Sequence, residues 1–132
     1  MQPPNAAGNA HRTISQFGVA LVILASSFTS VANLIFRAAM SETNSLSAPL
    51  IIDRLLHRTT FYAAWVLYVA AIAIWFRVLQ TEPLSSAYPI LTSITFTLVS
   101  AGAVLLFHEE MSVMKVAGMV LILFGVALVS KG

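Results

Sequence analysis

The sequence predicts an all-α membrane protein with four transmembrane helices, and three observations support this prediction. The chain has 132 residues, of which 58% are hydrophobic and only 9% are charged, whereas a soluble domain is about a quarter charged. Four long runs contain no charged residue, and crossing the hydrocarbon of a bilayer takes roughly 20 helical residues. No run shows the strict alternation of a membrane β-strand, so a barrel is not expected.

The chain is expected to form one domain, residues 1–132, in which residues 1–12 are a flexible N-terminus. The predicted spans cover about residues 13–37, 59–80, 83–107 and 111–130. The last two connections are short, which makes consecutive spans antiparallel neighbours. The first run is longer than the core of a signal peptide and no small-residue cleavage site follows it, so we expect it to stay in the mature chain.

The long connection between the first two spans carries a possible short interfacial helix. In the run Leu50–Arg58, apolar residues alternate in pairs with charged ones at nearly one helical turn per repeat, and Pro49 suits a first helical position. An amphipathic helix lying in the membrane interface explains this pattern. An N-terminal extension of the second span explains it equally well.

The charged residues and the absence of cysteine exclude several classes of function. Without cysteine there is no disulfide framework, thiolate zinc site or cysteine nucleophile. The seven basic residues are scattered, so nucleic acid is not an expected partner. They divide three against four between the two membrane faces, a weak bias for predicting orientation. With no nucleophile–base pair, paired carboxylates in a span or metal-ligand cluster, we expect neither an enzyme nor a metal or cofactor site.

The first span places its polar residues on one helical face. Ser26, Ser30, Asn33 and Arg37 follow each other at spacings of four, three and four residues. Polar groups inside a bilayer mark functional sites, although serine hydroxyls serve equally well in helix packing. Arg37 could bind a phosphate-bearing headgroup, or its side chain could simply reach the headgroup layer.

The second and third spans supply the other candidate wall residues. Trp65 belongs to an aromatic stripe that either packs against helices and lipid or lines a pathway. In the third span, Tyr88 and Thr92 lie on a hydroxyl-bearing face, and Pro89 removes one helical hydrogen bond. This helix suits the moving wall of a partly polar cavity; alternatively, its hydroxyls bond to its own carbonyl groups.

The fourth span carries two glycines seven residues apart, Gly118 and Gly125, on one face. Small residues let helix backbones approach closely, so this face is a candidate seam between helices or between subunits. Just before the span, His108 and Glu109 are too few ligands to indicate a metal site. A carboxylate there is also favoured by the helix dipole.

Three sequence pieces of the second half, taken as a set, resemble a known family. They are Leu79-Gln80 through Ala87-Tyr88-Pro89, the pair His108-Glu109, and the run Gly118–Leu128. The set resembles the four-span, small multidrug resistance-like branch of the drug/metabolite transporter superfamily, and is most similar to aminoarabinose-phosphoundecaprenol flippase subunits. The resemblance implies an integral, multi-pass protein of the bacterial inner membrane that works as a dimer, with Glu109 in its substrate site.

The sequence also departs from the drug exporters of that branch. Those exporters resemble one another in a glutamate midway along the first helix, and Thr13–Phe36 contains no acidic residue. Leu91 stands where those exporters have a tryptophan. A proton-coupled exporter of cations needs a titratable group in its pathway, so drug efflux is the second choice.

These observations favour a transporter or flippase subunit that moves a polyprenyl-phosphate-linked sugar, or a similar amphipathic lipid, across the inner membrane. Alternatives are small-molecule or drug efflux and a non-transporting accessory subunit of a membrane glycosyltransferase. The expected partners are the lipid bilayer, the lipid-linked substrate, and a second four-span subunit, either identical or paralogous. The candidate substrate-binding residues are Ser30, Asn33, Arg37, Trp65, Tyr88, Thr92 and Glu109.

Overall fold

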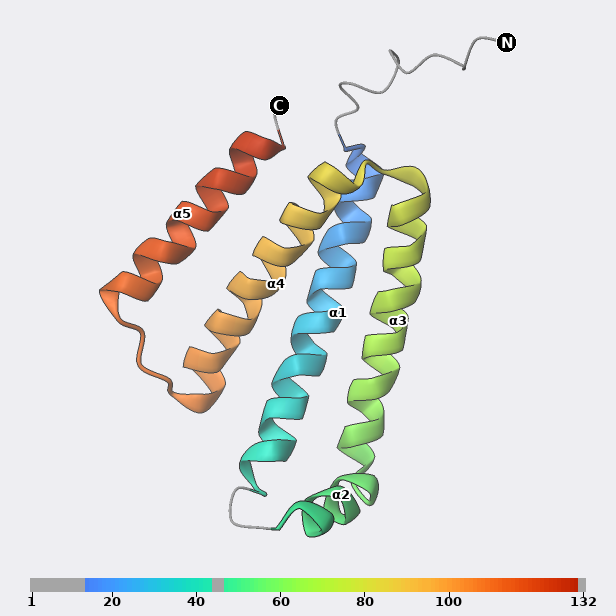
Figure 1. The fold of residues 1–132 in the computed structure, drawn as a ribbon, viewed down its shortest axis with the longest axis vertical. Helices are drawn as coiled ribbons and strands as arrows, with labels where there is room; N and C mark the ends of the chain where they lie inside the picture. Colours follow the sequence, from blue (N-terminus) through green and yellow to red (C-terminus); the bar gives the residue numbers. More distant parts are fainter. Residues whose placement is uncertain (1–13, 44–46, 131–132) are drawn as a thin grey trace.

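The computed structural model describes residues 14–43 and 47–130, and the structure is α-helical in all its regular elements within those ranges (Figure 1). The expected flexible N-terminus, residues 1–12, lies outside the described residues. The helices are α1 (Gln16–Ser41), α2 (Ala48–Leu56), α3 (Thr59–Thr81), α4 (Leu84–Phe107) and α5 (Val113–Val129). The prediction of an all-α fold is confirmed.

Three of the helices, α1, α3 and α4, are long and apolar enough to cross a membrane, and α5 is a shorter apolar helix of 17 residues. At a rise of 1.5 Å per residue, α5 is about 25 Å long and covers most of a hydrocarbon layer of about 30 Å. It begins later than the expected fourth span because Ser112 caps it, accepting a hydrogen bond from the Lys115 amide. The chain is a four-span, multi-pass membrane protein.

Consecutive spanning helices run antiparallel, as predicted, but α3 and α4 are not packing neighbours as expected, because α1 lies between them and packs against both (Figure 1). The side chains that α1 buries against these two helices are small. Across the three helices the buried residues are Gly18, Val22, Ala25, Ser26, Ser30, Ala32, Ala39, Ala64, Ala71, Val78, Ala87 and Ser93. Small residues allow helix backbones to approach closely where the surrounding lipid supplies no hydrophobic driving force.

The start of α1 is fixed by the turn between α3 and α4. The Ser15 side chain accepts a hydrogen bond of 2.9 Å from the Gly18 amide, and the Glu82 carboxylate accepts one of 2.9 Å from the Ser15 amide. The Ser15 hydroxyl also donates to Glu82. A side chain at position 18 would collide with the Glu82 side chain and force it to shift, so glycine leaves room for Glu82 to bind Ser15 in this position.

Helix α2 is a separate element, so the alternative that Leu50–Arg58 extends α3 is wrong. The helix ends at His57, and Arg58 takes an extended conformation before α3 begins. Ile52 and Leu56 are exposed on α2. An ion pair between Arg58 and Glu42 joins the end of α1 to the start of α3, and this hydrogen bond and charge hold the pKa of Glu42 below its ordinary value. The predicted short helix between the first two spans is confirmed.

Helix α5 differs from the other spanning helices because no residue is buried along its described length. It packs against α4 and leans away from the rest of the bundle (Figure 1). No atom of the described residues comes within 4 Å of the position that a Cβ would take at Gly118 or Gly125. The two glycines therefore form no close helix contact inside this part of the chain, and a seam built on them would need a second subunit.

Candidate functional site

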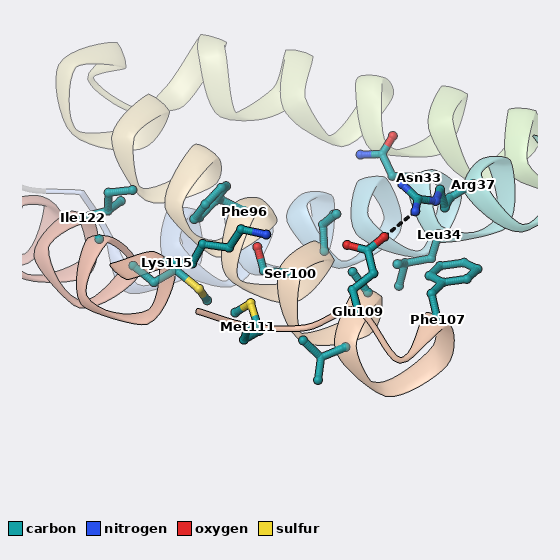
Figure 2. Close-up of a pocket in the computed structure, with 15 residues that line it drawn as sticks. Asn33, Leu34, Arg37, Phe96, Ser100, Phe107, Glu109, Met111, Lys115 and Ile122 are labelled. Carbon is teal, nitrogen blue, oxygen red and sulfur yellow. Dashed lines mark hydrogen bonds and ion pairs between the residues drawn. The ribbon is translucent and has the colours of Figure 1, made fainter. Parts of the chain in front are cut away.

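A cleft of about 500 Å³ opens between α1, α4 and α5, along the C-terminal parts of α1 and α4 (Figure 2). Its walls are mainly apolar, and its polar groups come from α1, α4, α5 and the connection between α4 and α5. The lining residues are Asn33, Leu34, Arg37, Phe96, Val99, Ser100, Ala103, Val104, Phe107, Glu109, Met111, Lys115, Gly118, Met119 and Ile122. A cleft of this size can hold a small molecule or the headgroup of a lipid.

One end of the cleft is charged. Arg37, in the last third of α1, forms an ion pair with Glu109, and its guanidinium lies 5.5 Å from the centre of the Phe107 ring (Figure 2). The side chains of Arg37 and Glu109 are 59% and 37% exposed, so the protein encloses neither of them. An exposed pair of this kind contributes at most about 1 kcal/mol to stability. It can therefore open without unfolding the bundle.

The backbone after α4 directs Glu109 toward Arg37. His108 takes the left-handed conformation, with φ of 51°, and the Glu109 amide donates a hydrogen bond of 3.4 Å to the Ala103 carbonyl. This conformation is uncommon for a residue other than glycine. It turns the chain back over the end of α4, which places the Glu109 side chain on the cleft.

Lys115 extends from the first turn of α5 into the same cleft, in the direction of Glu109 (Figure 2). It makes no ion pair with any residue in the described ranges. Asn33 and Ser100 add an amide and a hydroxyl to the lining. The charged end thus holds two cations, one carboxylate and two neutral polar groups.

Two further, mainly apolar cavities lie along α4 beyond the cleft, and we call these two cavities the groove. A second cavity, of about 340 Å³, shares Phe96 and Ile122 with the first and is also lined by Thr92 and Val126. A third, of about 530 Å³, shares Tyr88 with the second and reaches the start of α4. The three cavities follow α4 along its 24 residues, a length of about 36 Å at the rise of an α-helix. The cleft and the groove together are therefore as long as the hydrocarbon layer is thick.

The structure brings five of the predicted site residues to this surface. Asn33, Arg37 and Glu109 line the charged cleft, and Tyr88 and Thr92 line the groove beyond it. The Thr92 hydroxyl donates a hydrogen bond of 2.9 Å to the Tyr88 carbonyl of its own helix. This is the alternative we considered for the hydroxyls of this span, and here it coexists with a position on the groove.

The other two predicted site residues lie elsewhere. Ser30 is buried between α1 and α4, where its hydroxyl donates to the Ser26 carbonyl at 2.7 Å and reaches the Thr95 carbonyl at 3.4 Å. Trp65 lies on α3 and packs edge-on against Phe36, with ring centres 5.9 Å apart. Neither residue lines the cleft or the groove, and both take part in helix packing.

Sequence reasoning missed Lys115 as a site residue, although one signal pointed to it. Lys115 is the third residue of α5, and the positive end of a helix dipole disfavours a cation in this position. The helix itself does not favour a lysine in this position, which suggests that Lys115 interacts with an anion. No comparable signal pointed to Phe96, Phe107 or Ser100, because their lining role depends on how far α5 lies from α4.

Comparison with known proteins places this geometry in context. The sequence model of the Small Multidrug Resistance protein family matches residues 34–122. The chain is 32% identical over 134 aligned positions to the probable 4-amino-4-deoxy-L-arabinose-phosphoundecaprenol flippase subunit ArnF of Shewanella sediminis, covering 91% of this chain and 92% of that protein.

Two further relatives match only in part. The probable subunit ArnE of the same flippase from Erwinia tasmaniensis is 41% identical over 61 residues, which cover 46% of this chain and 56% of the relative. Subunit ArnF of Serratia proteamaculans is 40% identical over 66 residues, covering 48% and 50%. These two alignments span about half the length of the relatives. No solved structure matches the chain significantly.

Proposed function

The chain belongs to the Small Multidrug Resistance protein family, and on this basis we propose that it is a subunit of a flippase for a polyprenyl-phosphate-linked sugar. The observation that supports the proposal most directly is the polarity of the cleft and groove. Charges gather at one end, and apolar residues line the remaining length of α4. A lipid with a phosphate at its head and a long hydrocarbon chain has the same polarity.

Each part of this surface has a role in the proposal. The guanidinium of Arg37 binds the phosphate, because its planar fork of N–H donors matches phosphate oxygens. Asn33 and Ser100 offer hydrogen bonds to the sugar hydroxyls. Phe96, Tyr88 and their apolar neighbours contact the polyprenyl chain. Transport exposes this surface first to one side of the inner membrane and then to the other.

A second subunit completes the pathway in this proposal. The groove of one chain is open along its length, and α5 has no buried residue over Val113–Val129. Gly118 and Gly125 leave bare backbone on α5 with open space beside it, which suits the close approach of another helix. The partner is a second copy of this chain or a paralogous four-span subunit, and its arrival encloses the substrate.

Efflux of cationic compounds is the second candidate, favoured by the description of the matching family. The charged end of the cleft opposes it, because Arg37 and Lys115 outnumber the single carboxylate of Glu109. A cation exporter would bind a quaternary ammonium compound in a pH-dependent manner. Saturable binding of such a compound, with no movement of a lipid-linked sugar, would favour efflux over the flippase.

The experiment that tests the proposal measures lipid movement in vesicles. The full chain, with a paralogous partner where one is encoded, is reconstituted with undecaprenyl phosphate that carries a fluorescent sugar. Dithionite then quenches the label on the outer leaflet. We expect the quenched fraction to rise above that of empty vesicles, because the protein returns label from the inner leaflet.

Two variants make this experiment specific. Arg37→Gln should slow the movement roughly 10- to 100-fold, the loss expected for a hydrogen bond to a charged group. Arg54→Gln removes a charge from α2, outside the cleft, and should leave the rate unchanged. Quenching equal to that of empty vesicles, with a verified partner present, would overturn the proposal.

A further inference from the structure

The cleft contains a carboxylate in a place where the proposed substrate has a phosphate. Glu109 forms an ion pair with Arg37 at the mouth of the cleft, and Lys115 extends toward it from α5 (Figure 2). On the basis of the proposed function, we infer that Glu109 is an internal competitor for the substrate: it occupies Arg37 in the empty cleft, and the phosphate displaces it to bind between Arg37 and Lys115.

The first argument is that a carboxylate and a phosphate bind a guanidinium in the same way. Both anions accept two parallel hydrogen bonds from the arginine fork. A single arginine therefore cannot hold Glu109 and a substrate phosphate in this geometry at once. Because both side chains of the pair are exposed to a large extent, the pair is weak enough for a bound anion to replace it.

The second argument is the imbalance of charge in the cleft. Glu109 neutralises one cation, and Lys115 has no partner among residues 14–43 and 47–130. Lys115 also adds its charge to the positive end of the α5 dipole. A phosphate that displaces Glu109 gains both cations, whereas Glu109 engages only Arg37. The site is thus arranged to prefer a phosphate over its own carboxylate.

The third argument is the position of Glu109 in the chain. It lies in the connection between α4 and α5, whereas Arg37 belongs to α1. The ion pair therefore joins α1 to the connection that leads into α5, which is the least packed of the spanning helices. When a phosphate takes Arg37, this connection is released. Binding of the headgroup is thereby linked to the freedom of α5 to move.

The test measures binding of undecaprenyl phosphate to the full chain in nanodiscs of zwitterionic lipid. Removing the competitor with Glu109→Gln should tighten binding up to about fivefold, the equivalent of an exposed ion pair. Arg37→Gln and Lys115→Gln should each weaken it roughly 10- to 100-fold. The double variant Arg37→Gln with Glu109→Gln should bind undecaprenyl phosphate no more tightly than Arg37→Gln alone, because the carboxylate competes only for Arg37.

Two variants serve as controls. Glu110→Gln removes the neighbouring carboxylate, which does not line the cleft, and should leave binding unchanged. Arg37→Lys keeps the charge but loses the fork; it should bind more weakly than wild type, and it replaces Arg37→Gln if that variant fails to fold. Unchanged or weaker binding in Glu109→Gln would overturn the inference, since Glu109 would then be a bystander or a ligand.

Three further probes identify the anion and its source. Undecaprenol lacks the phosphate and should show no gain in Glu109→Gln. A gain for undecaprenyl phosphate alone assigns the site to the lipid, and a gain also for inorganic phosphate assigns it to phosphate in general. Anionic phosphatidylglycerol, present in place of the zwitterionic lipid, should compete weakly. If neither undecaprenyl phosphate nor inorganic phosphate binds more tightly to Glu109→Gln than to wild type, the inference is overturned.

The binding and transport measurements fail independently. If binding depends on Glu109 but no lipid movement is measured, the competitor role of Glu109 stands and the proposed flippase function is overturned. Lipid movement by wild type with no effect of Glu109→Gln on binding would retain the flippase and overturn the competitor.

Discussion

The bundle of α1, α3 and α4 and the single helix α5 differ in how they are packed. Helices α1, α3 and α4 bury twelve small residues, one of them a glycine. Helix α5 buries no side chain along Val113–Val129. Lipid tails are as apolar as leucine, so an exposed apolar helix costs little in a bilayer. Stability resides in the three-helix bundle, and α5 is left free for interactions outside it.

The two regions also differ in whether their small residues pack against another helix. Gly102 on α4 lies so close to Leu34 of α1 that a side chain there would collide with it, whereas Gly118 and Gly125 on α5 face open space. Glycine thus lies at an existing helix contact on α4, and on α5 it lies on a surface that no other helix in the described ranges contacts. Substitutions placed in matched positions can test this distinction.

The largest effect is expected from overpacking the three-helix bundle. Ala32→Leu inserts three heavy atoms at a site with no exposed surface, which should lower the free energy of unfolding by about 1–3 kcal/mol. Ala127→Leu makes the same change on exposed α5 and should alter it little. Denaturant titration in micelles measures both. Equal losses in the two variants would mean that α5 is packed as firmly as the bundle.

The next largest effect is expected at the glycines of α5 and should appear only in assembly. Gly125→Leu has room in the single chain, so its unfolding should match that of wild type. The dissociation constant of the dimer should rise about tenfold, because the added side chain separates the two backbones. Light scattering across a dilution series measures this. An unaffected dimer would place the subunit contact on another face.

A smaller effect is expected from the hydroxyls between α1 and α4. The Ser26 hydroxyl reaches the Leu91 carbonyl on α4 at 3.2 Å, and such bonds contribute about 0.6 kcal/mol inside membranes. Ser26→Ala should lower the free energy of unfolding by about that amount. Ser27 bonds only to the Ile23 carbonyl of its own helix, so Ser27→Ala is the control. A larger loss of stability in Ser27→Ala than in Ser26→Ala would contradict the assignment of Ser26 to interhelical packing.

The smallest effect is expected at Glu42, and it depends on pH. Arg58 lowers the pKa of this carboxyl below 4.5, so the ion pair contributes to stability above that value. The contribution disappears as the pH falls through the lowered pKa. Glu42→Gln should therefore reduce the thermal midpoint slightly at pH 7 and not at all in strong acid. A larger difference in acid than at pH 7 would show that the pair is not the cause.

The fold was predictable because apolar runs of bilayer length leave few alternatives. The four spans and their antiparallel order followed from the pattern of charged and apolar residues, whereas this pattern left open whether Leu50–Arg58 forms a separate helix or extends α3. The site was less predictable. Ser30, Asn33 and Arg37 share one face of α1, yet Ser30 meets the backbone of α4 while the other two meet the cleft. The difference arises from the local separation of the helices, which spacing along one helix does not encode.

Trp65 and Lys115 illustrate the same limit from opposite directions. The aromatic stripe that contains Trp65 has its partner in Phe36 of α1, a residue whose facing helix the sequence alone did not identify. Lys115 lies at a helix start that disfavours it, which is a local signal, but its direction depends on the position of α5. Which residues share one face of a helix was predictable from spacing, whereas the packing partner of Trp65 and the direction of Lys115 depend on the positions of two helices and were not predictable.

The bond between Ser15 and Glu82 has a consequence for biosynthesis. The capping carboxylate lies 67 positions downstream of the serine that it serves, in the turn after α3. The first turn of α1 therefore gains this bond only after α1 and α3 have both crossed the membrane and the turn after α3 has emerged on the side where Ser15 lies. A nascent chain inserted with the wrong number of crossings leaves that turn on the far side, so the bond acts as a check on correct integration.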